Sequence, residues 1–311
     1  MPNLEATFFG KFNIEQRGFT IKGIRARKVQ ELLSYLLIFR NHAQSREVLC
    51  ETLWGDLPSL NSRQYLRQTL WRLQSAIKTN NSEQELKLHV DNHWIQINVS
   101  HEFWLDVEEF EKIFNLVIAK RTPELRTRDH KLMEYAARLY KGDLLDGWYP
   151  DWCLFERERF QTMHLMLLDK LVQFCELNKK YETGLLYGIE ILRHDHAYER
   201  THRQLMRLYF MTGNRTEALH QYDRCVLALR AELGVEPSQR TKRLYEQIRL
   251  DKFEPQSSAE ITTVIKTKVR ATPVLKDVLH RLEEVSATLD RLEHKFEKEI
   301  VGPGDAVSDQ S

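Results

Sequence analysis

The spacing of apolar residues changes several times along the first hundred positions, between the alternation of strands and the 3.6-residue period of helices. Gly18 marks a turn between two of the short alternating runs. Ser45 stands directly before one of the helical runs, where a residue that caps a helix N-terminus is expected. The pattern predicts three short strands followed by three helices, at residues 4–10, 12–14, 19–21, 27–39, 46–54 and 61–78.

Two further alternating runs, at residues 86–90 and 94–98, are joined by Asp91, Asn92 and His93. Asp and Asn tolerate the positive φ that a tight hairpin demands, so we expect a two-stranded hairpin here. A helix, a short helix, a turn, a long helix and a terminal hairpin follow one another as in a winged helix-turn-helix, whose wing is the hairpin. The additional strands at the front are typical of the OmpR-like subtype.

From residue 103 to about residue 250 the apolar spacing is helical throughout. Within this stretch, residues 180–186 align with residues 214–220 at an offset of 34, which is the tetratricopeptide period. Small residues, Gly184 and Ala218, occupy the same place in both segments, where two paired helices must approach closely. The pattern predicts an all-α, tetratricopeptide-like repeat domain.

The last sixty residues have a different pattern. Residues 252–271 hold few large apolar side chains and are typical of a linker, and residues 301–311 are expected to be a disordered tail. Between them, apolar residues recur at alternating spacings of three and four, at Leu275, Val278, Leu282, Val285, Leu289, Leu292 and Phe296. This heptad pattern predicts either a coiled coil or an amphipathic helix that folds back onto the repeat domain.

We therefore expect a mainly α protein with an N-terminal α+β winged helix. The expected parts are a winged-helix DNA-binding domain, a helical repeat domain, a linker, an amphipathic or coiled-coil helix and a tail, at residues 1–101, 102–251, 252–271, 272–300 and 301–311.

The net charge of +1 conceals a difference between the first hundred residues, which are basic, and the remaining residues, which are slightly acidic. Residues 1–100 carry 13 Lys and Arg against 9 Asp and Glu, and residues 57–82 contain four basic residues and no acidic one. Phosphate contact needs a basic segment of this kind, because each neutralised phosphate releases a condensed counterion. Ordinary protein surfaces also carry basic helices, so charge alone does not decide for DNA.

The helix expected at residues 61–78 has the two faces of a DNA-reading helix. Leu66, Leu70, Leu73 and Ile77 form one narrow apolar stripe that must face the core. Gln and Asn bond adenine bidentately and Arg bonds guanine, which suits the major groove. The other interpretation is a polar helix that faces only solvent. The opposite face carries Asn61, Gln64, Gln68, Trp71, Arg72 and Ser75, with Arg67 at its margin.

Further expectations concern the surroundings of this face. Arg63 and Lys78, nearer its flanks, suit phosphate contacts. Trp71 either meets thymine methyl groups or sugars, or packs beneath the wing. At the tip of the wing, Asn92 and His93 are expected to touch a minor groove or the DNA backbone, although a hairpin tip is polar by default.

Several motifs occur in a fixed order between residues 4 and 250. They are YLRQTLWRL at 65–73, WLDVEEF at 104–110, YKGDLL at 140–145, DWCLFERER at 151–159, YFMTGNRTEALHQY at 209–222 and ELGVEPS at 232–238. In these segments the chain resembles the bacterial transcriptional activator domain family and is similar to the streptomycete antibiotic regulatory proteins. The resemblance implies a DNA-binding activator that recruits RNA polymerase, with a helical domain that serves dimerisation, effector response or polymerase contact.

The sequence departs from larger relatives in two respects. It has no GxxxxGK[ST] phosphate loop, so we do not expect nucleotide-driven switching within this chain. We also expect no receiver domain, because the expected winged helix occupies the first residues of the sequence. The expected partners are double-stranded DNA, RNA polymerase and a second copy of the chain. Whether an effector or a further partner protein also binds is left open.

Metal, disulfide and catalytic sites are not expected. His194 and His196 flank a turn without a third ligand, and Asp143, Asp146 and Asp151 lack the order of a calcium loop. The four cysteines form no CxxC pair and are expected to act as small hydrophobic residues. No nucleophile elbow, HExxH helix or dinucleotide loop occurs, so neither an enzyme nor a cofactor is expected. Residues 156–159, Glu-Arg-Glu-Arg, are typical of a salt-bridged helix face.

The chain is expected to be cytoplasmic. Its longest nearly apolar stretch, residues 32–39, is far short of the ~20 residues of a membrane span, and its start lacks the features of a signal peptide. The alternative to a DNA-binding regulator is a tetratricopeptide-like scaffold or adaptor whose winged helix serves protein–protein contact.

Overall fold

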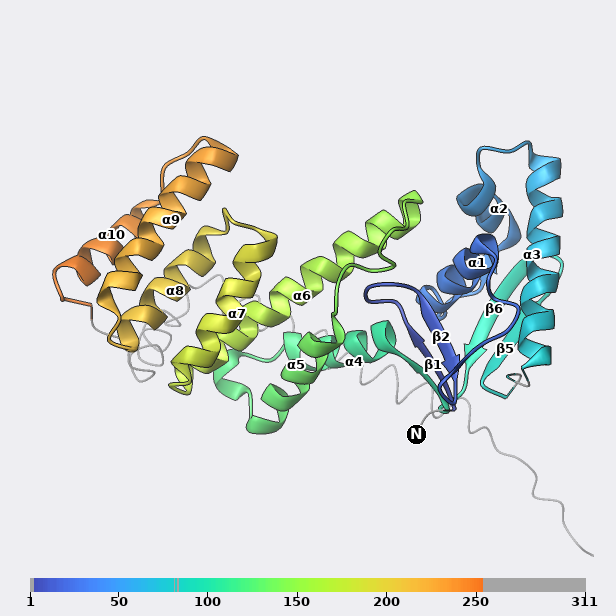
Figure 1. Ribbon diagram of the computed structural model, residues 1–311, viewed down its shortest axis with the longest axis horizontal. Coiled ribbons are helices and arrows are strands. Elements are labelled where there is room, and N and C mark those ends of the chain that lie inside the picture. Colours follow the sequence, from blue (N-terminus) through green and yellow to red (C-terminus); the bar gives the residue numbers. More distant parts are fainter. Residues whose placement is uncertain (1–2, 81, 83, 254–311) are drawn as a thin grey trace, which may run out of the picture. The chain divides into compact units, whose positions relative to one another are not determined.

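The computed structural model describes residues 3–80, 82 and 84–253. The heptad helix and the tail expected at 272–300 and 301–311, and the linker from residue 254 on, lie outside the described residues. The elements are β1 (Leu4–Thr7), β2 (Asn13–Gln16), β3 (Phe19–Thr20), α1 (Arg27–Ile38), β4 (Gln44–Ser45), α2 (Arg46–Trp54), α3 (Ser59–Thr79), β5 (Leu86–Val90), β6 (Trp94–Val99), β7 (Phe103–Leu105), α4 (Asp106–Ile118), η1 (Thr122–Glu124), α5 (Thr127–Leu139), α6 (Asp151–Leu177), α7 (Tyr181–His194), α8 (Glu199–Met211), α9 (Arg215–Leu233) and α10 (Gln239–Arg249) (Figure 1).

The first sheet has the strand order β3-β2-β1-β7. Strand β1 pairs antiparallel with β2 and parallel with β7, so that Leu4 lies opposite both Gln16 and Phe103. The expectation of helix throughout from residue 103 is therefore wrong for β7. This strand forms because Phe103 and Leu105 bury their side chains beside β1, a partner at the start of the chain that local spacing does not reveal.

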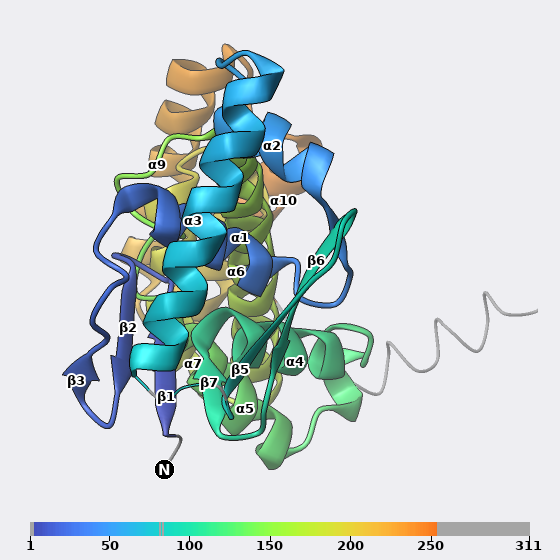
Figure 2. The ribbon, with the colours of Figure 1, turned by 90° about the vertical axis from the view of Figure 1, so that its right-hand side faces the viewer.

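Helices α1 to α3 and the β5–β6 hairpin form the winged helix, and the sheet β4-β6-β5 contains the wing (Figure 2). Helix α2 begins and ends where the sequence predicts. Ser45 caps it, because its Oγ accepts the backbone N–H of Glu47 at 3.2 Å. The apolar stripe of α3 faces the core as expected, with Leu66, Leu70 and Leu73 buried.

The turn of the wing closes in another way than the sequence suggested. None of the residues 91–93 has a positive φ, so that explanation of the hairpin is wrong. Instead, the Asp91 carboxylate accepts the backbone N–H groups of His93 and Trp94, each at 2.7 Å. An Asp side chain that bonds its own turn supplies the reversal without left-handed backbone.

The rest of the described chain is helical, and α6 to α10 pack in succession, each on the next. The predicted close approach occurs at Gly184 of α7, where an added Cβ would lie 3.1 Å from Cβ of Cys175 and from a methyl group of Leu208. Ala218 takes the equivalent place in α9 and is fully buried. The predicted fold class, a winged helix followed by a tetratricopeptide-like helical repeat, is confirmed.

One apolar core runs from the winged helix into the helical repeat. The ring of Phe9 lies 5.3 Å from that of Phe110 in α4, 4.9 Å from that of Tyr140 and 5.4 Å from that of Phe160 in α6. All four cysteines are buried and unpaired. Among the helices of the described residues, none combines the length and the apolar character that a membrane crossing requires.

Candidate nucleic-acid interface

The outward face of α3 is open to solvent. The side chains predicted to read or contact DNA are all exposed: Asn61, Arg63, Gln64, Arg67, Gln68, Trp71, Arg72 and Lys78. Trp71 has 67% of its surface exposed, so the expectation that it packs beneath the wing is wrong. A large aromatic side chain exposed on a polar helix face is available to a ligand.

These side chains have few partners of their own. In the part of the chain that the structure describes, Arg63 alone among them forms an ion pair, with Glu47 at 3.5 Å, and both side chains are exposed. An exposed pair of this length contributes about 0–1 kcal/mol, so a phosphate can replace the carboxylate at little cost. The cations and amides of α3 are therefore not committed to the fold.

Two contacts fix the C-terminal end of α3 on the domain. The Asn80 side chain accepts the backbone N–H of Lys22 at 3.2 Å and donates to the Lys22 carbonyl at 2.8 Å. Gly23 packs against Ala76, where an added Cβ would lie 2.9 Å from Cβ of Ala76. A helix held in this way presents its outer face in one orientation, which side-chain contacts to base edges require.

A hollow of about 470 Å³ separates α3 from the wing and the start of α2. Arg46 joins its walls, because its guanidinium donates to the Asp91 carbonyl at 3.0 Å and its backbone N–H to the His93 carbonyl at 2.9 Å. The backbone N–H groups of His93 and Trp94 lower the pKa of the Asp91 carboxyl, against a smaller opposing effect of desolvation. The side chains that line the hollow include Arg46, Arg63, Arg67, Asn92, His93 and Trp94.

The structure thus brings the wing residues Asn92 and His93 to the same hollow as Arg63 and Arg67. It also adds residues that sequence reasoning missed, namely Arg46, Tyr65 and Trp94. Trp94 has 51% of its surface exposed, and Tyr65 is also exposed. The exposure of Tyr65 could be predicted from the helical wheel of α3. The positions of Arg46 and Trp94 depend on how the hairpin packs, for which the sequence holds no signal.

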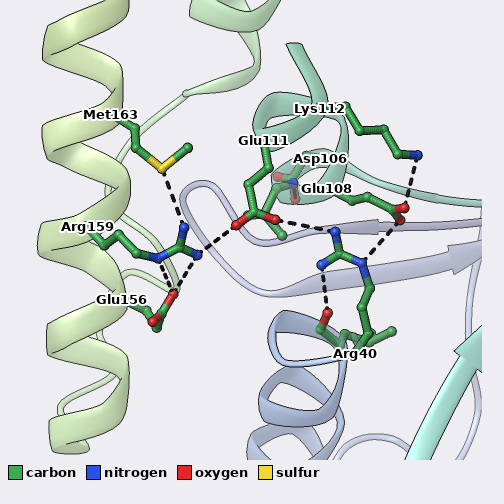
Figure 3. Close-up of polar contacts among 10 residues, drawn as sticks. Arg40, Asp106, Glu108, Glu111, Lys112, Glu156, Arg159 and Met163 are labelled. Carbon is green, nitrogen blue, oxygen red and sulfur yellow. Dashed lines mark hydrogen bonds and ion pairs between the residues drawn. The ribbon is translucent and has the colours of Figure 1, made fainter. Parts of the chain in front are cut away.

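The winged helix is fixed to the helical repeat by a chain of ion pairs, which we call the junction (Figure 3). Arg40, just after α1, lies 3.6 Å from Glu108 and 3.3 Å from Glu111. Figure 3 shows Glu111 between two guanidinium groups, since Arg159 of α6 approaches it from the other side at 2.8 Å. Arg159 also pairs with Glu156 at 2.7 Å. The side chain of Arg159 is 41% exposed, the other charges of this chain are largely buried, and all of them bind each other.

Asp106 closes the junction at the start of α4. Its buried carboxylate accepts the backbone N–H groups of Phe8 and Phe9 at 2.8 Å, at the end of the first strand, and of Val107. Burial raises the pKa of this carboxyl to about 6, against the opposing effect of the three N–H groups. One side chain thereby ties β1 to α4.

The expectation of a salt-bridged face at residues 156–159 is right for Glu156 and Arg159 and wrong for Arg157. Arg157 donates to the carbonyls of Leu144 and Trp148 at 3.0 and 2.9 Å, and also to that of Leu145. It does so because the loop between α5 and α6 turns these carbonyl oxygens toward α6, where they need a hydrogen-bond donor. Arg157 therefore orders the loop.

The histidines that were weighed as metal ligands have other neighbours. His194 lies 3.4 Å from the Gln161 amide and 3.8 Å from Glu190, and His196 lies 3.7 Å from Glu232. Over residues 3–253, as far as they are described, no three His, Cys, Asp or Glu side chains gather at metal-binding distance.

Comparison with known proteins identifies the helical part. A chain of EmbR from Mycobacterium tuberculosis, whose structure was solved in complex with a low-affinity phosphopeptide, has the same fold with a TM-score of 0.68 and 15% identity; the match covers 88% of this chain and 73% of that one. A search of curated protein sequences found no match. Residues 105–249 match the family model "Bacterial transcriptional activator domain". Residues 105–249 therefore resemble a bacterial transcriptional activator domain, a domain of the transcription-regulator type.

Proposed function

We propose that the protein is a sequence-specific DNA-binding transcription regulator that inserts α3 into the major groove. The observation that carries this proposal is the outer face of α3, where polar and basic side chains are exposed and uncommitted beside an exposed Trp71. A fold gains nothing from such a face, whereas base edges and phosphates complement it in chemistry.

Each predicted residue has a role in this proposal. Asn61, Gln64 and Gln68 offer amides to adenine, and Arg67 and Arg72 offer guanidinium groups to guanine. Trp71 meets thymine methyl groups or sugars. The flanking residues Arg63 and Lys78 bind phosphates, and Asn92 and His93 of the wing bind the backbone or a minor groove. Arg46 and Trp94 extend the same surface across the hollow.

We further propose a division of labour between residues 1–101, which bind DNA, and residues 102–251, which serve dimerisation, regulation or contact with RNA polymerase. The family implies the polymerase contact. A second half-site would add avidity, since one winged helix makes a modest interface. Deleting residues 272–300 and measuring the molar mass by light scattering tests the heptad segment as a dimerisation element; an unchanged association would refute it.

In vitro selection tests the DNA-reading function. The purified full chain is mixed with sheared genomic DNA of its host at near-physiological salt, and the bound fragments are sequenced. We expect a short repeated motif upstream of a few genes, and no such motif with the variant Arg67→Ala/Gln68→Ala. Recovery without a motif that disappears as salt rises would contradict sequence reading. A scaffold or adaptor would then be the better account.

A further inference from the structure

A second basic surface lies on the helical repeat, at the turn between α4 and α5. Residues 120–131 hold five Lys and Arg against two acidic residues, although residues 101–311 as a whole carry 33 Lys and Arg against 36 Asp and Glu. This concentration of positive charge opposes the trend of the domain, and neither the fold nor DNA reading by α3 accounts for it.

The two acidic residues of the turn are used to build it. Asp129 is buried and accepts Nζ of Lys120 at 2.6 Å and the backbone N–H of Arg126 at 2.9 Å. The bond from Lys120 lowers the pKa of this carboxyl. Glu124 accepts the backbone N–H of Arg121 at 3.2 Å. These carboxylates cap the turn, and the one cation they pair with is Lys120.

The remaining cations are uncommitted. Arg121, Arg126, Arg128 and Lys131 are exposed, and in the described stretch of the chain none of them lies within ion-pair distance of a carboxylate. Beneath the turn, Lys170 of α6 is only 8% exposed and donates Nζ to the carbonyls of Ile118, at 2.7 Å, and Lys120. This buried contact holds the turn on α6, so the cations stand on a fixed support.

The surface between these cations is hollowed and partly apolar. A hollow of about 440 Å³ is lined by three cations, by the two carboxylates that build the turn and by two leucines: Lys120, Arg126, Arg128, Glu124, Asp129, Leu116 and Leu132. Leu116 has 52% of its surface exposed. A DNA backbone gains nothing from leucine side chains, whereas a protein segment that carries both carboxylates and a large apolar side chain complements the two unpaired arginines and the leucines.

The place of the turn favours a protein partner as well. Figure 1 shows α3 on the far side of α1 from α4 and α5. Helix α4, with 13 residues, runs about 20 Å from the junction to the turn. The turn is thus directed away from the DNA face and stays accessible while α3 lies in a groove.

We propose that the α4–α5 turn is a docking site for an acidic protein segment with a large apolar side chain, seated on Arg126, Arg128 and Leu116. This surface goes beyond DNA reading and does not depend on it, so the two proposals fail separately. Charge complementarity steers such a segment to the turn, and Leu116 and Leu132 distinguish it from other polyanions.

The test uses the full chain and a fluorescein-labelled twelve-residue peptide of Glu with two Leu, followed by fluorescence anisotropy at near-physiological salt. We expect saturable binding that is at least tenfold weaker in Arg126→Glu/Arg128→Glu and about threefold weaker in Leu116→Ala. The matched control, Arg63→Glu/Lys78→Glu on α3, changes the net charge equally and should leave peptide binding unchanged. A peptide with Gln in place of Glu should not bind.

Three results would overturn the proposal. The peptide fails to bind the wild-type chain, or both charge-reversed variants lose it equally, in which case net charge alone attracts it. The third is that Arg126→Glu/Arg128→Glu weakens binding of a 30-base-pair DNA as strongly as the α3 variant does, which would make the turn a DNA contact. Circular dichroism of each variant establishes that it is folded.

Discussion

Two regions of the molecule use arginine in opposite ways. At the junction, Arg40 and Arg159 share Glu111 at 3.3 and 2.8 Å; Arg40 and Glu111 are largely removed from solvent, and Arg159 keeps 41% of its side chain exposed. On α3, Arg67 and Arg72 are exposed and have no carboxylate within ion-pair distance in the described chain. The arginines of the junction are thus bound by carboxylates, whereas those of α3 are available to the ligand that we propose for this face.

Tryptophan repeats the contrast. Trp152 is buried at the start of α6 and packs its ring 5.3 Å from that of Tyr35 in α1. Trp71 and Trp94 instead stand exposed on α3 and on the wing. Burying an aromatic side chain stabilises a fold by several kcal/mol. Trp71 and Trp94 contribute little of this kind to the fold, which is consistent with the proposed DNA contact.

The largest effect on stability is expected in the apolar core that the winged helix and the helical repeat share. Phe160→Ala should lower the free energy of unfolding by about 3–5 kcal/mol, because Phe160 is fully buried between Phe9 and Phe110. The matched control is Phe155→Ala on the same helix, 71% exposed, which should change the free energy by less than about 0.5 kcal/mol. Urea unfolding followed by circular dichroism measures both. Equal effects would contradict a shared core.

Two buried groups should titrate in opposite directions: Asp106 of the junction, and His164 of α6, whose ring stacks 4.2 Å from that of Tyr140. Burial lowers the pKa of His164 to about 4, so its contribution to stability is lost as the pH falls from about 6.5 toward 4. Burial raises the pKa of Asp106 to about 6, so its contribution is present below about pH 4 and is lost as the pH rises through 6. Each amounts to about 3 kcal/mol, and the two nearly cancel.

Removing one group should expose the other. Relative to wild type, His164→Phe should gain stability as the pH falls from 6.5 to 4, and Asp106→Asn should lose it. Unfolding free energies measured between pH 4 and 7 give both difference curves. Curves that run parallel to that of the wild-type protein would show that neither group carries the perturbed pKa.

The next largest effect is expected from Glu111, the carboxylate that Arg40 and Arg159 share. Glu111→Gln should lower the free energy of unfolding by about 1–3 kcal/mol, because it leaves Arg40 and Arg159 partly buried with weaker partners. Glu190→Gln is the control, since Glu190 pairs with Arg193 at 2.6 Å on the exposed side of α7 and should change stability by about 0.5 kcal/mol or less. A comparison of urea midpoints decides; an equal loss in both would make the junction ordinary surface.

The smallest effect is expected from single phosphate contacts. Arg63→Ala and Lys78→Ala should each reduce the slope of log K against log salt for DNA binding by about 0.9, without a change in base preference. Arg193→Ala on α7 should leave the slope unchanged. A salt titration of DNA affinity measures all three, and unchanged slopes in the α3 variants would remove these two residues from the interface.

The local pattern of apolar and polar residues predicts most of the outer face of α3. The spacing that defines α3 also tells which side chains oppose its apolar stripe, so Gln64, Gln68 and Arg72 could be placed from the sequence. Ser45 could be identified as a cap for the same reason, because its partner Glu47 is two residues away.

The junction could not be predicted in this way. Asp106 bonds Phe8 and Phe9, nearly one hundred positions earlier, and β7 exists because β1 is beside it. Arg157 was assigned to a surface because its neighbours in sequence are charged, whereas its partners are carbonyl groups of a loop. Contacts between distant parts of the chain leave no periodic pattern in the sequence. For the same reason, the position of Trp94 beside α3 could not be predicted.

Base discrimination by α3 decides whether this helix reads DNA sequence. The affinity of the wild-type chain, Arg67→Ala and Gln68→Ala is measured for a selected DNA site and for each of its single-base-pair variants, with Arg128→Ala as control. We expect each α3 variant to lose about 1–3 kcal/mol of discrimination at one or two base pairs, and the control to lose none. Unchanged discrimination in both α3 variants would rule out base reading by Arg67 and Gln68.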